Sequence, residues 1–271
     1  MINRKNQWAP RLVAQENQAE ICALLAALSS NEIPAIQIPH FLQPSDLDTI
    51  SNNLHRQRIN WYPNKENEQG RIGISTTEYH YFENGKERYF DSVFGAAKIR
   101  DDIFSGASNP ITKIITLFSH GFETAVATDP DLGNKEYFTG LIRAMGAKST
   151  LHFDHAPSQL PGWSVSNCDD QFALVVHLKP ADNGGELNVY NHPWRAEDDK
   201  FNKDIGQKGT YGFTDSFLSS ATYAKITPLA GDLIIFRSRN FHQVADIFSK
   251  GPRLTLGTFM TLNSGKLSLW S

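Results

Sequence analysis

Two histidines and one aspartate in the second half of the chain could together form a metal site. The first pattern is His152-Phe153-Asp154. In an extended segment alternate side chains share a face, so His152 and Asp154 would point to one side, with Cα atoms about 7 Å apart, and Phe153 to the other. His242 follows 90 positions after His152, behind an apolar, strand-like run. Each pattern alone is also common among structural residues, but two imidazoles and one carboxylate are the ligands that hold non-haem Fe(II) with coordination positions left open.

An arginine lies 11 positions after His242, in the run GPRLTLGTF. Strand alternation places Arg253 and Thr255 on one face and Leu254 and Leu256 on the other. A buried arginine is costly unless its charge is paired. The partner could be a ligand carboxylate held by a bidentate clamp with the Thr255 hydroxyl beside it, or an aspartate in an ordinary ion pair.

These residues lie in a part of the chain that has the pattern of a β domain. From residue 137 onward, short runs of β-forming residues alternate with Pro, Gly, Asn and Asp, which is typical of a sandwich or barrel. The runs are 137–146, 149–156, 171–180, 185–191, 223–229, 231–238 and 253–262. A polar insertion at about 195–222 interrupts them, and such an insertion is either a lid or binding loop or variable surface.

The first 136 residues have a mostly helical pattern. They predict a helix over 16–30, a strand within 33–42, a helix with Ser45 as N-cap, a polar loop over 60–71, a strand over 72–82 and two helices within 86–125. No repeat or linker separates the two parts. We therefore expect one domain over 1–271, with a helical N-terminal flank (1–136) packed on a β core (137–271).

Composition excludes several classes of protein. The chain of 271 residues has 26 Lys and Arg against 29 Asp and Glu, a net charge of −3, and no basic run, which argues against nucleic-acid binding. No apolar stretch approaches the roughly 20 residues of a membrane span, and the basic start has no apolar segment behind it, unlike a secretory signal. Two cysteines cannot form a disulfide framework, so we expect a reducing, cytoplasmic location.

Taken together, the order H-x-D, a GGEL hairpin, H and R-x-T resembles the Fe(II)/2-oxoglutarate-dependent dioxygenases. This resemblance implies a mainly β fold with a helical flank, built as a double-stranded β-helix (a cupin-like jelly roll). It implies that His152, Asp154 and His242 bind Fe(II), that 2-oxoglutarate and O2 are consumed, and that Arg253 pairs with the distal carboxylate of 2-oxoglutarate. Thr255 would be the hydroxyl partner of the same carboxylate.

Several fragments narrow the resemblance. GGELNVYNHPW, GDLIIFRSRNFHQV, PRLTLGTF, the C-terminal LWS and IRAM at 142–145 are similar to a small bacterial branch. That branch contains N-substituted amino-acid hydroxylases and carrier-free indole-alkaloid halogenases, and the match is strongest over 137–271. Its halogenases have Gly or Ala where its hydroxylases have the carboxylate, because chloride needs the vacated position. Asp154 therefore favours hydroxylation.

Further residues have less specific signals. Arg143 could contact the C1 carboxylate of 2-oxoglutarate or an anionic substrate, or form a structural ion pair. Ser75, Thr77, Tyr79 and Tyr81 share one face of the strand predicted over 72–82, and a strand near this place helps to frame the substrate pocket in the family; Ser75, Thr77 and Tyr79 are our substrate-binding candidates there. Tyr190, Asn188 and Trp194 on the GGEL hairpin could line the same pocket, with Tyr190 the preferred candidate. His155 follows the metal pattern, but strand alternation turns it away from the metal.

The sequence thus predicts an Fe(II)/2-oxoglutarate oxygenase that hydroxylates an aliphatic carbon of a small molecule, either an amino-acid derivative or a specialised metabolite, with succinate and CO2 as co-products. The alternatives are a halogenase or desaturase with the same iron centre, a cupin with another metal, or a non-catalytic jelly roll that binds a metal or ligand. The expected partner is the small-molecule substrate, without nucleic acid or membrane; the residues do not indicate an oligomeric state.

Overall fold

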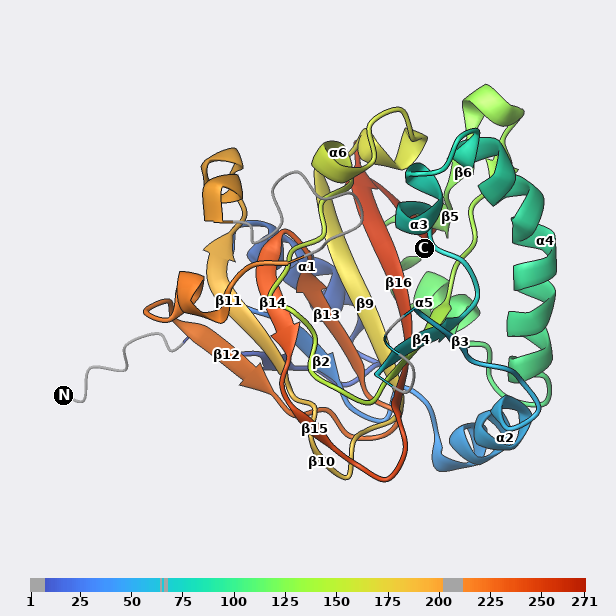
Figure 1. Cartoon of the computed structure of the whole chain (residues 1–271), viewed down its shortest axis with the longest axis horizontal. Coiled ribbons are helices and arrows are strands. Elements are labelled where there is room, and N and C mark those ends of the chain that lie inside the picture. The colour runs from blue at the N-terminus through green and yellow to red at the C-terminus, as the bar shows by residue number, and fades with distance from the viewer. Residues whose placement is uncertain (1–7, 64, 66–67, 202–211) are drawn as a thin grey trace.

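Two β-sheets face each other, and helices cover the outer side of the larger one (Figure 1). The structure is a computed structural model that describes residues 8–63, 65, 68–201 and 212–271. Within these ranges no helix combines the length and apolarity needed to cross a bilayer.

The large sheet has ten strands, with β9 and β16 at its centre. Its order is β1 (Arg11–Leu12), β2 (Ile36–Ile38), β13 (Leu233–Arg237), β9 (Asp170–Lys179), β16 (Arg253–Asn263), β8 (Leu141–Met145), β4 (Gln69–Ile72) and β3 (Asn60–Trp61). β17 (Lys266–Trp270) also pairs with β16, and β5 (Glu123–Val126) pairs with β17. β9 is buried on both faces along nearly its whole length, which explains its almost continuous apolar sequence.

The small sheet carries part of the metal site. It consists of β12 (Tyr223–Ile226), β11 (Leu187–Pro193) and β14 (Asn240–Val244). Two-stranded pairs are formed by β10 (Asn183–Gly184) with β15 (Ile247–Phe248), and by β6 (Thr128–Asp129) with β7 (Lys135–Glu136). Val189 of β11 packs in one apolar cluster with Ala173 and Phe236 of the large sheet, so the two sheets enclose a common interior.

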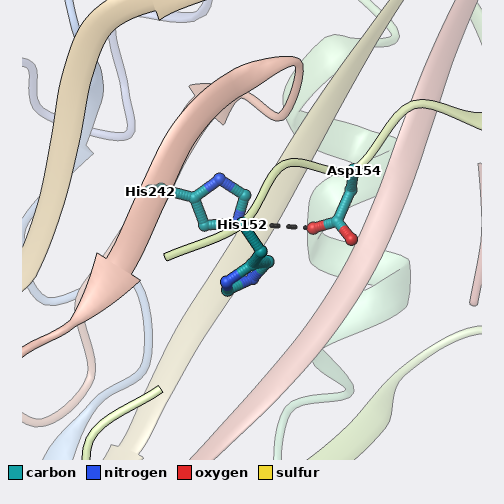
Figure 2. Close-up of side chains that lie close together, drawn as sticks. All are labelled: His152, Asp154 and His242. Carbon is teal, nitrogen blue, oxygen red and sulfur yellow. Dashed lines mark ion pairs between the residues drawn. The ribbon is translucent and has the colours of Figure 1, made fainter. Parts of the chain in front are cut away.

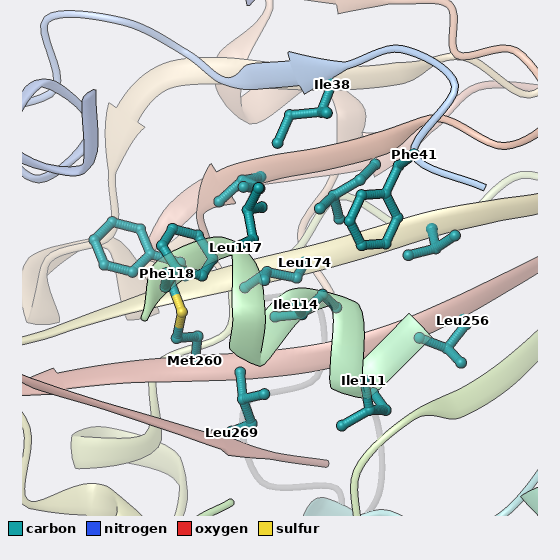
Figure 3. Packing of buried hydrophobic residues seen from close by; sticks show 14 of the residues in the cluster. Ile38, Phe41, Ile111, Ile114, Leu117, Phe118, Leu174, Leu256, Met260 and Leu269 are labelled. Carbon is teal, nitrogen blue, oxygen red and sulfur yellow. The ribbon is translucent and has the colours of Figure 1, made fainter. Parts of the chain in front are cut away.

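The other face of the large sheet is covered by α1 (Gln18–Ser29) and α5 (Pro110–Phe118). Ile114 and Leu117 of α5 belong to the same apolar core as Leu174 and Met260 of the sheet (Figure 3). The remaining helices are α2 (Pro44–Leu54), α3 (Thr76–His80), α4 (Gly85–Phe104) and α6 (Ala156–Gln159), with 3-10 turns at Pro130–Leu132, Ser164–Ser166, Ala196–Phe201 and Asp215–Leu218. This outer layer fixes the sheet whose inner face carries the site.

The helices predicted over 16–30 and within 86–125 are confirmed, but three local predictions are wrong. The N-cap of α2 is Gln43 rather than Ser45, with Pro44 in the first turn and a capping box to Asp46. Residues 60–71 are not a loop throughout, because they contain β3 and most of β4. The strand predicted over 72–82 ends at Ile72, since Gly73 has φ +108° and α3 follows.

The N-terminal part also contributes more strand than predicted. Besides β2, which lies within the strand predicted over 33–42, β1, β3, β4 and β5 belong to the large sheet, where β2 pairs with β13 and β4 with β8. Of the predicted insertion at about 195–222, residues 202–211 lie outside the described residues, and its two ends form the 3-10 turns Ala196–Phe201 and Asp215–Leu218.

Candidate active site

His152 and His242 are brought together by a backbone pairing. His242 lies in the middle of β14, and His152 forms an isolated antiparallel bridge with it. The His152 amide donates to the His242 carbonyl at 3.0 Å, and the His242 amide donates to the His152 carbonyl at 2.7 Å. Residues directly opposite in such a pairing have neighbouring side chains, and the two imidazole centroids are 4.2 Å apart.

Asp154 completes a compact triad with the two histidines (Figure 2). One potential ligand atom from each of the three side chains lies within 4.8 Å of the others, and the His242 Nε2 to Asp154 Oδ2 distance is 3.3 Å. Two ligands at right angles, each about 2.1 Å from a metal ion, lie about 3 Å apart. The arrangement therefore fits a small divalent ion such as Fe(II).

The hydrogen bonds of the imidazoles leave their Nε2 atoms available for the metal. Nδ1 of His152 lies 2.6 Å from the Thr150 carbonyl, and Nδ1 of His242 lies 2.9 Å from the Asn240 carbonyl. A carbonyl can only accept, so each Nδ1 carries the proton. Burial, and then the neighbouring His242, lower the pKa of His152 to about 4. His152 is therefore neutral near pH 7, as a metal ligand must be.

The side chains beside the triad follow the predicted alternation. Phe153 stacks on Trp194 at a centroid distance of 4.6 Å, in an apolar cluster on the opposite side from the metal ligands. His155 also turns away from the triad and lies 5.6 Å from the Trp194 ring. Trp194 is thus a packing residue behind the metal-binding segment.

Arg253 is a buried cation at the start of β16. It is 4% exposed, and its Nη1 lies 3.9 Å from the sulfur of Met145, its cross-strand neighbour on β8. Burial lowers the pKa of Arg253 to about 10, so its guanidinium is positively charged near pH 7. Within the described ranges no carboxylate forms an ion pair with it, which removes the ordinary Arg–Asp pair as the explanation of its position. Thr255, two positions later, is 4% exposed.

Comparisons with known proteins show the family of the chain. The family described as carrier-protein-independent halogenase WelO5 matches residues 14–271. The chain belongs to this family. Its relatives include the Leucinostatins biosynthesis cluster protein S of Purpureocillium lilacinum (29% identical over 201 residues, 70% of this chain and 78% of the relative). Another is the L-gamma-glutamyl-L-propargylglycine hydroxylase of Streptantibioticus cattleyicolor (23% identical over 252 residues, 90% of both chains).

The fold of this family member is shared with a solved structure. The N-substituted L-amino acid dioxygenase of Burkholderia ambifaria, in complex with alpha-KG, superposes with a TM-score of 0.64 at 17% identity and covers 93% of this chain and 91% of its own. The chain is thus an enzyme of the WelO5 family with this fold, and the side chains of His152, Asp154 and His242 fit the Fe(II) of an Fe(II)/2-oxoglutarate oxygenase. Bound together, Fe(II), 2-oxoglutarate and O2 supply the oxidising power, with succinate and CO2 as co-products.

A polar row crosses the inner face of the large sheet beside the triad. Arg71 of β4 pairs in register with Arg143 of β8, Arg143 with Thr255 of β16, and Thr255 with His177 of β9. Directly opposite residues share a face of the sheet. The next residues along the four strands, Ile72, Ile142, Leu256 and Val176, belong to the outer core, which confirms that the polar row faces inward.

Arg143 sits in a cluster of charged and hydroxyl groups. Its Nη1 is 3.4 Å from the hydroxyl of Tyr62, and Tyr62 donates to Glu78 at 2.5 Å. Arg71 forms an ion pair with the same Glu78 carboxylate. Burial alone would lower the pKa of Arg143, but Tyr62, Glu78 and Asp154 hold it above its ordinary value. The negative charge of Asp154 is one of the causes of this shift, so Arg143 lies within electrostatic range of the triad.

Sequence reasoning missed three members of this cluster, Arg71, Tyr62 and Glu78. Residues 60–71 have the polar composition of a loop, and no sequence pattern indicates that Glu78 folds back onto Arg71. The sequence also suggested no role for His177. The position of His177 within the apolar run QFALVVHLK is nevertheless a signal, because a polar ring in a strand buried on both faces is expected to have a hydrogen-bond partner.

Four predicted substrate-binding residues lie in surroundings other than those expected. Ser75 is 3% exposed at the N-terminus of α3, with its hydroxyl 3.0 Å from that of Thr77. Tyr79 packs edge-on against Tyr89 and donates to the Ser92 hydroxyl. These three residues therefore do not share a strand face, because the segment is helical. Tyr190 is on the face of β11 opposite to Val189, the partner of His242, and accepts from Gln243.

Proposed function

We propose that this enzyme hydroxylates an aliphatic carbon of a small molecule, either an amino-acid derivative or a specialised metabolite. The observation that carries the proposal is the third protein ligand: the Asp154 carboxylate lies within the triad, 3.3 Å from His242 Nε2. Halogenases of the resembled branch have Gly or Ala at this position, which leaves room for chloride. With Asp154 in place, the remaining positions serve 2-oxoglutarate and O2, and hydroxylation is favoured.

The relatives support this choice of substrate class. One is named as the hydroxylase of a dipeptide and one as a dioxygenase of L-isoleucine. Arg143 supplies a matching group on the chain itself: a positive charge beside the metal site that can bind a carboxylate, either the C1 carboxylate of 2-oxoglutarate or that of an amino-acid substrate. Arg71 and Tyr62 bind the Glu78 carboxylate, whose negative charge stabilises the Arg143 guanidinium.

We also propose that Arg253 and Thr255 hold the distal carboxylate of 2-oxoglutarate. A guanidinium that is 4% exposed with a thioether as its neighbour is suited to an anion from outside the protein. Thr255 shares its face of β16 and is equally buried. Arg253 and Thr255 would hold one end of the cosubstrate while the metal binds the other end. A substrate carbon placed next to the metal would then be the group closest to the oxidant.

The family name favours one rival, halogenation at the same metal. The decisive experiment is incubation with Fe(II), ascorbate, 2-oxoglutarate and a library of amino acids and their N-substituted derivatives, with and without excess chloride, followed by mass spectrometry. We expect a product that has gained one oxygen, with matching succinate, in both conditions. A chlorinated main product would make the enzyme a halogenase, and the loss of two hydrogens would make it a desaturase. Absence of succinate with every substrate would favour a non-catalytic binding protein.

We infer further that the two facing sheets are the double-stranded β-helix of the dioxygenases, and that residues 1–271 act as one domain. The strands that the N-terminal part adds to the large sheet support this. A cytoplasmic location is supported by the two cysteines, both of which are free thiols.

A further inference from the structure

His177 is the most deeply buried titratable group next to the proposed cosubstrate clamp. It has no exposed surface, and neither Nδ1 nor Nε2 has a hydrogen-bond partner among the described residues. A neutral imidazole always carries one N–H donor. An unsatisfied buried polar group costs about 1–3 kcal/mol, so a leucine or valine would suit this strand better unless the ring has a ligand to bind.

The position of His177 shows what that ligand could be. It is the cross-strand partner of Thr255, which places the two side chains next to each other on the inner face of the sheet. Arg253 lies two positions from Thr255 on the same face, and its charge acts on the His177 ring. One imidazole, one hydroxyl and one guanidinium are thus gathered in one buried place.

The same three groups match the capacity of a carboxylate. A carboxylate has about four lone-pair sites. A bidentate guanidinium fills two of them, so two remain for other donors. Arg253 and Thr255 leave room for one more N–H, and His177 is the neighbouring group with an unused donor.

We propose that His177 donates a hydrogen bond to the distal carboxylate of 2-oxoglutarate, beside Arg253 and Thr255. This deepens the proposed function, because it rests on the placement of that carboxylate at Arg253. His177 is then a positioning residue for the cosubstrate: it selects 2-oxo acids that carry a second carboxylate over those that do not.

The test compares two ligands and three variants in binding experiments without O2. The Fe(II)-loaded protein is titrated calorimetrically with 2-oxoglutarate and with 2-oxobutyrate, which has the same chelating end but no distal carboxylate. His177→Phe removes the donor at similar size and should weaken 2-oxoglutarate binding about tenfold or more, with 2-oxobutyrate binding unchanged. His177→Asn keeps an N–H and should recover part of the affinity. Val175→Ala, two positions earlier on the same face of β9, is the matched packing control and should leave the ratio of the two affinities unchanged.

The outcomes separate the two proposals. If wild-type protein does not bind 2-oxoglutarate, the proposed function fails. If it does, and His177→Phe leaves the ratio of the two affinities as in wild type, the role of His177 is wrong while the function stands. Thermal unfolding of the ligand-free variants shows whether each is folded; a destabilised His177→Phe is replaced by the His177→Leu variant, for which the same change in ratio is expected.

Discussion

The Asp154 carboxylate lies 3.3 Å from Nε2 of His242, although the two residues belong to different segments of the interior. Backbone hydrogen bonds make this approach possible. The Asp154 amide donates to the Ser238 carbonyl at 2.9 Å, and the Ser238 hydroxyl donates to the Asp154 carbonyl at 2.9 Å. With His152 bridged to His242, both ends of the His152–Asp154 segment are attached to the strand region that carries the other ligand. Backbone hydrogen bonds thus fix the relative positions of the three ligand residues.

Replacement of Asp154 tests the third ligand. Asp154→Ala removes one ligand, and we expect Fe(II) affinity and hydroxylation to fall by at least about a hundredfold, more than the loss of an outer-shell partner. Asp48→Ala, an exposed aspartate on α2, is the control and should behave as wild type. Metal content after dialysis and the rate of succinate formation are the measurements. An Asp154→Ala variant that retains iron and rate would show that the triad is not the metal site.

Replacement of Arg253 tests the cosubstrate clamp. Arg253→Leu removes the charge and leaves an apolar side chain of lesser length. The KM for 2-oxoglutarate should therefore rise by about a hundredfold, whereas Fe(II) binding should change little. Arg195→Leu is the matched control, because Arg195 is an exposed arginine that pairs with Glu197. An unchanged KM in Arg253→Leu would show that Arg253 does not bind 2-oxoglutarate. That result would favour a cupin with different chemistry.

The folded state should be sensitive to mild acid because of His177. Burial, and then the charge of Arg253, hold the pKa of His177 well below its ordinary value. Below about pH 6.5 the unfolded chain binds a proton that the folded chain does not, so the free energy of unfolding falls as the pH falls, by about 1.4 kcal/mol per pH unit for one such group. His177→Asn cannot titrate, so its urea unfolding at pH 5–7 should show a shallower dependence than wild type. Equal slopes would mean that the folded protein protonates this ring freely.

Part of the metal site could be predicted from the sequence because the spacing of His152 and Asp154 is local information. Strand alternation alone places His152 and Asp154 on one face, and His155 and Phe153 away from them. The order of Arg253 and Thr255 behind His242, through the resemblance to the dioxygenases, predicted a cosubstrate clamp. Period-two geometry supplied only the faces, and the roles of His242, Arg253 and Thr255 were implied by the resemblance to the dioxygenases. The structure preserves the predicted alternation at His152, Phe153 and Asp154.

The residues around the metal site could not be placed from the sequence, because their orientation depends on contacts between segments far apart in the chain. The alternation of Ser75, Thr77 and Tyr79 fits a strand, but the left-handed Gly73 ends β4 and the next segment becomes α3. Tyr190 is on a strand as predicted, yet its face follows from the register of β11 with β14, which places Val189 opposite His242. Only tertiary pairing can decide such a face.

Gly185, finally, connects the hairpin to the clamp. Its φ is +71°, and a Cβ there would lie 3.0 Å from Ala181 Cβ and 3.4 Å from the Cδ of Arg253. Gly133 has the same φ, but a Cβ there would meet nothing within 4 Å. The two alanine variants therefore share the cost of a left-handed conformation, about 1 kcal/mol, and differ in crowding.

We expect Gly185→Ala to lower the unfolding temperature more than Gly133→Ala does. It should also be the variant of the two that raises the KM for 2-oxoglutarate, by severalfold, because the added methyl group contacts the Arg253 stem. Thermal unfolding and steady-state kinetics measure both effects. If Gly185→Ala loses stability like Gly133→Ala and keeps the wild-type KM, the glycine serves the turn alone. The position of Arg253 would then not depend on the absence of a side chain at residue 185.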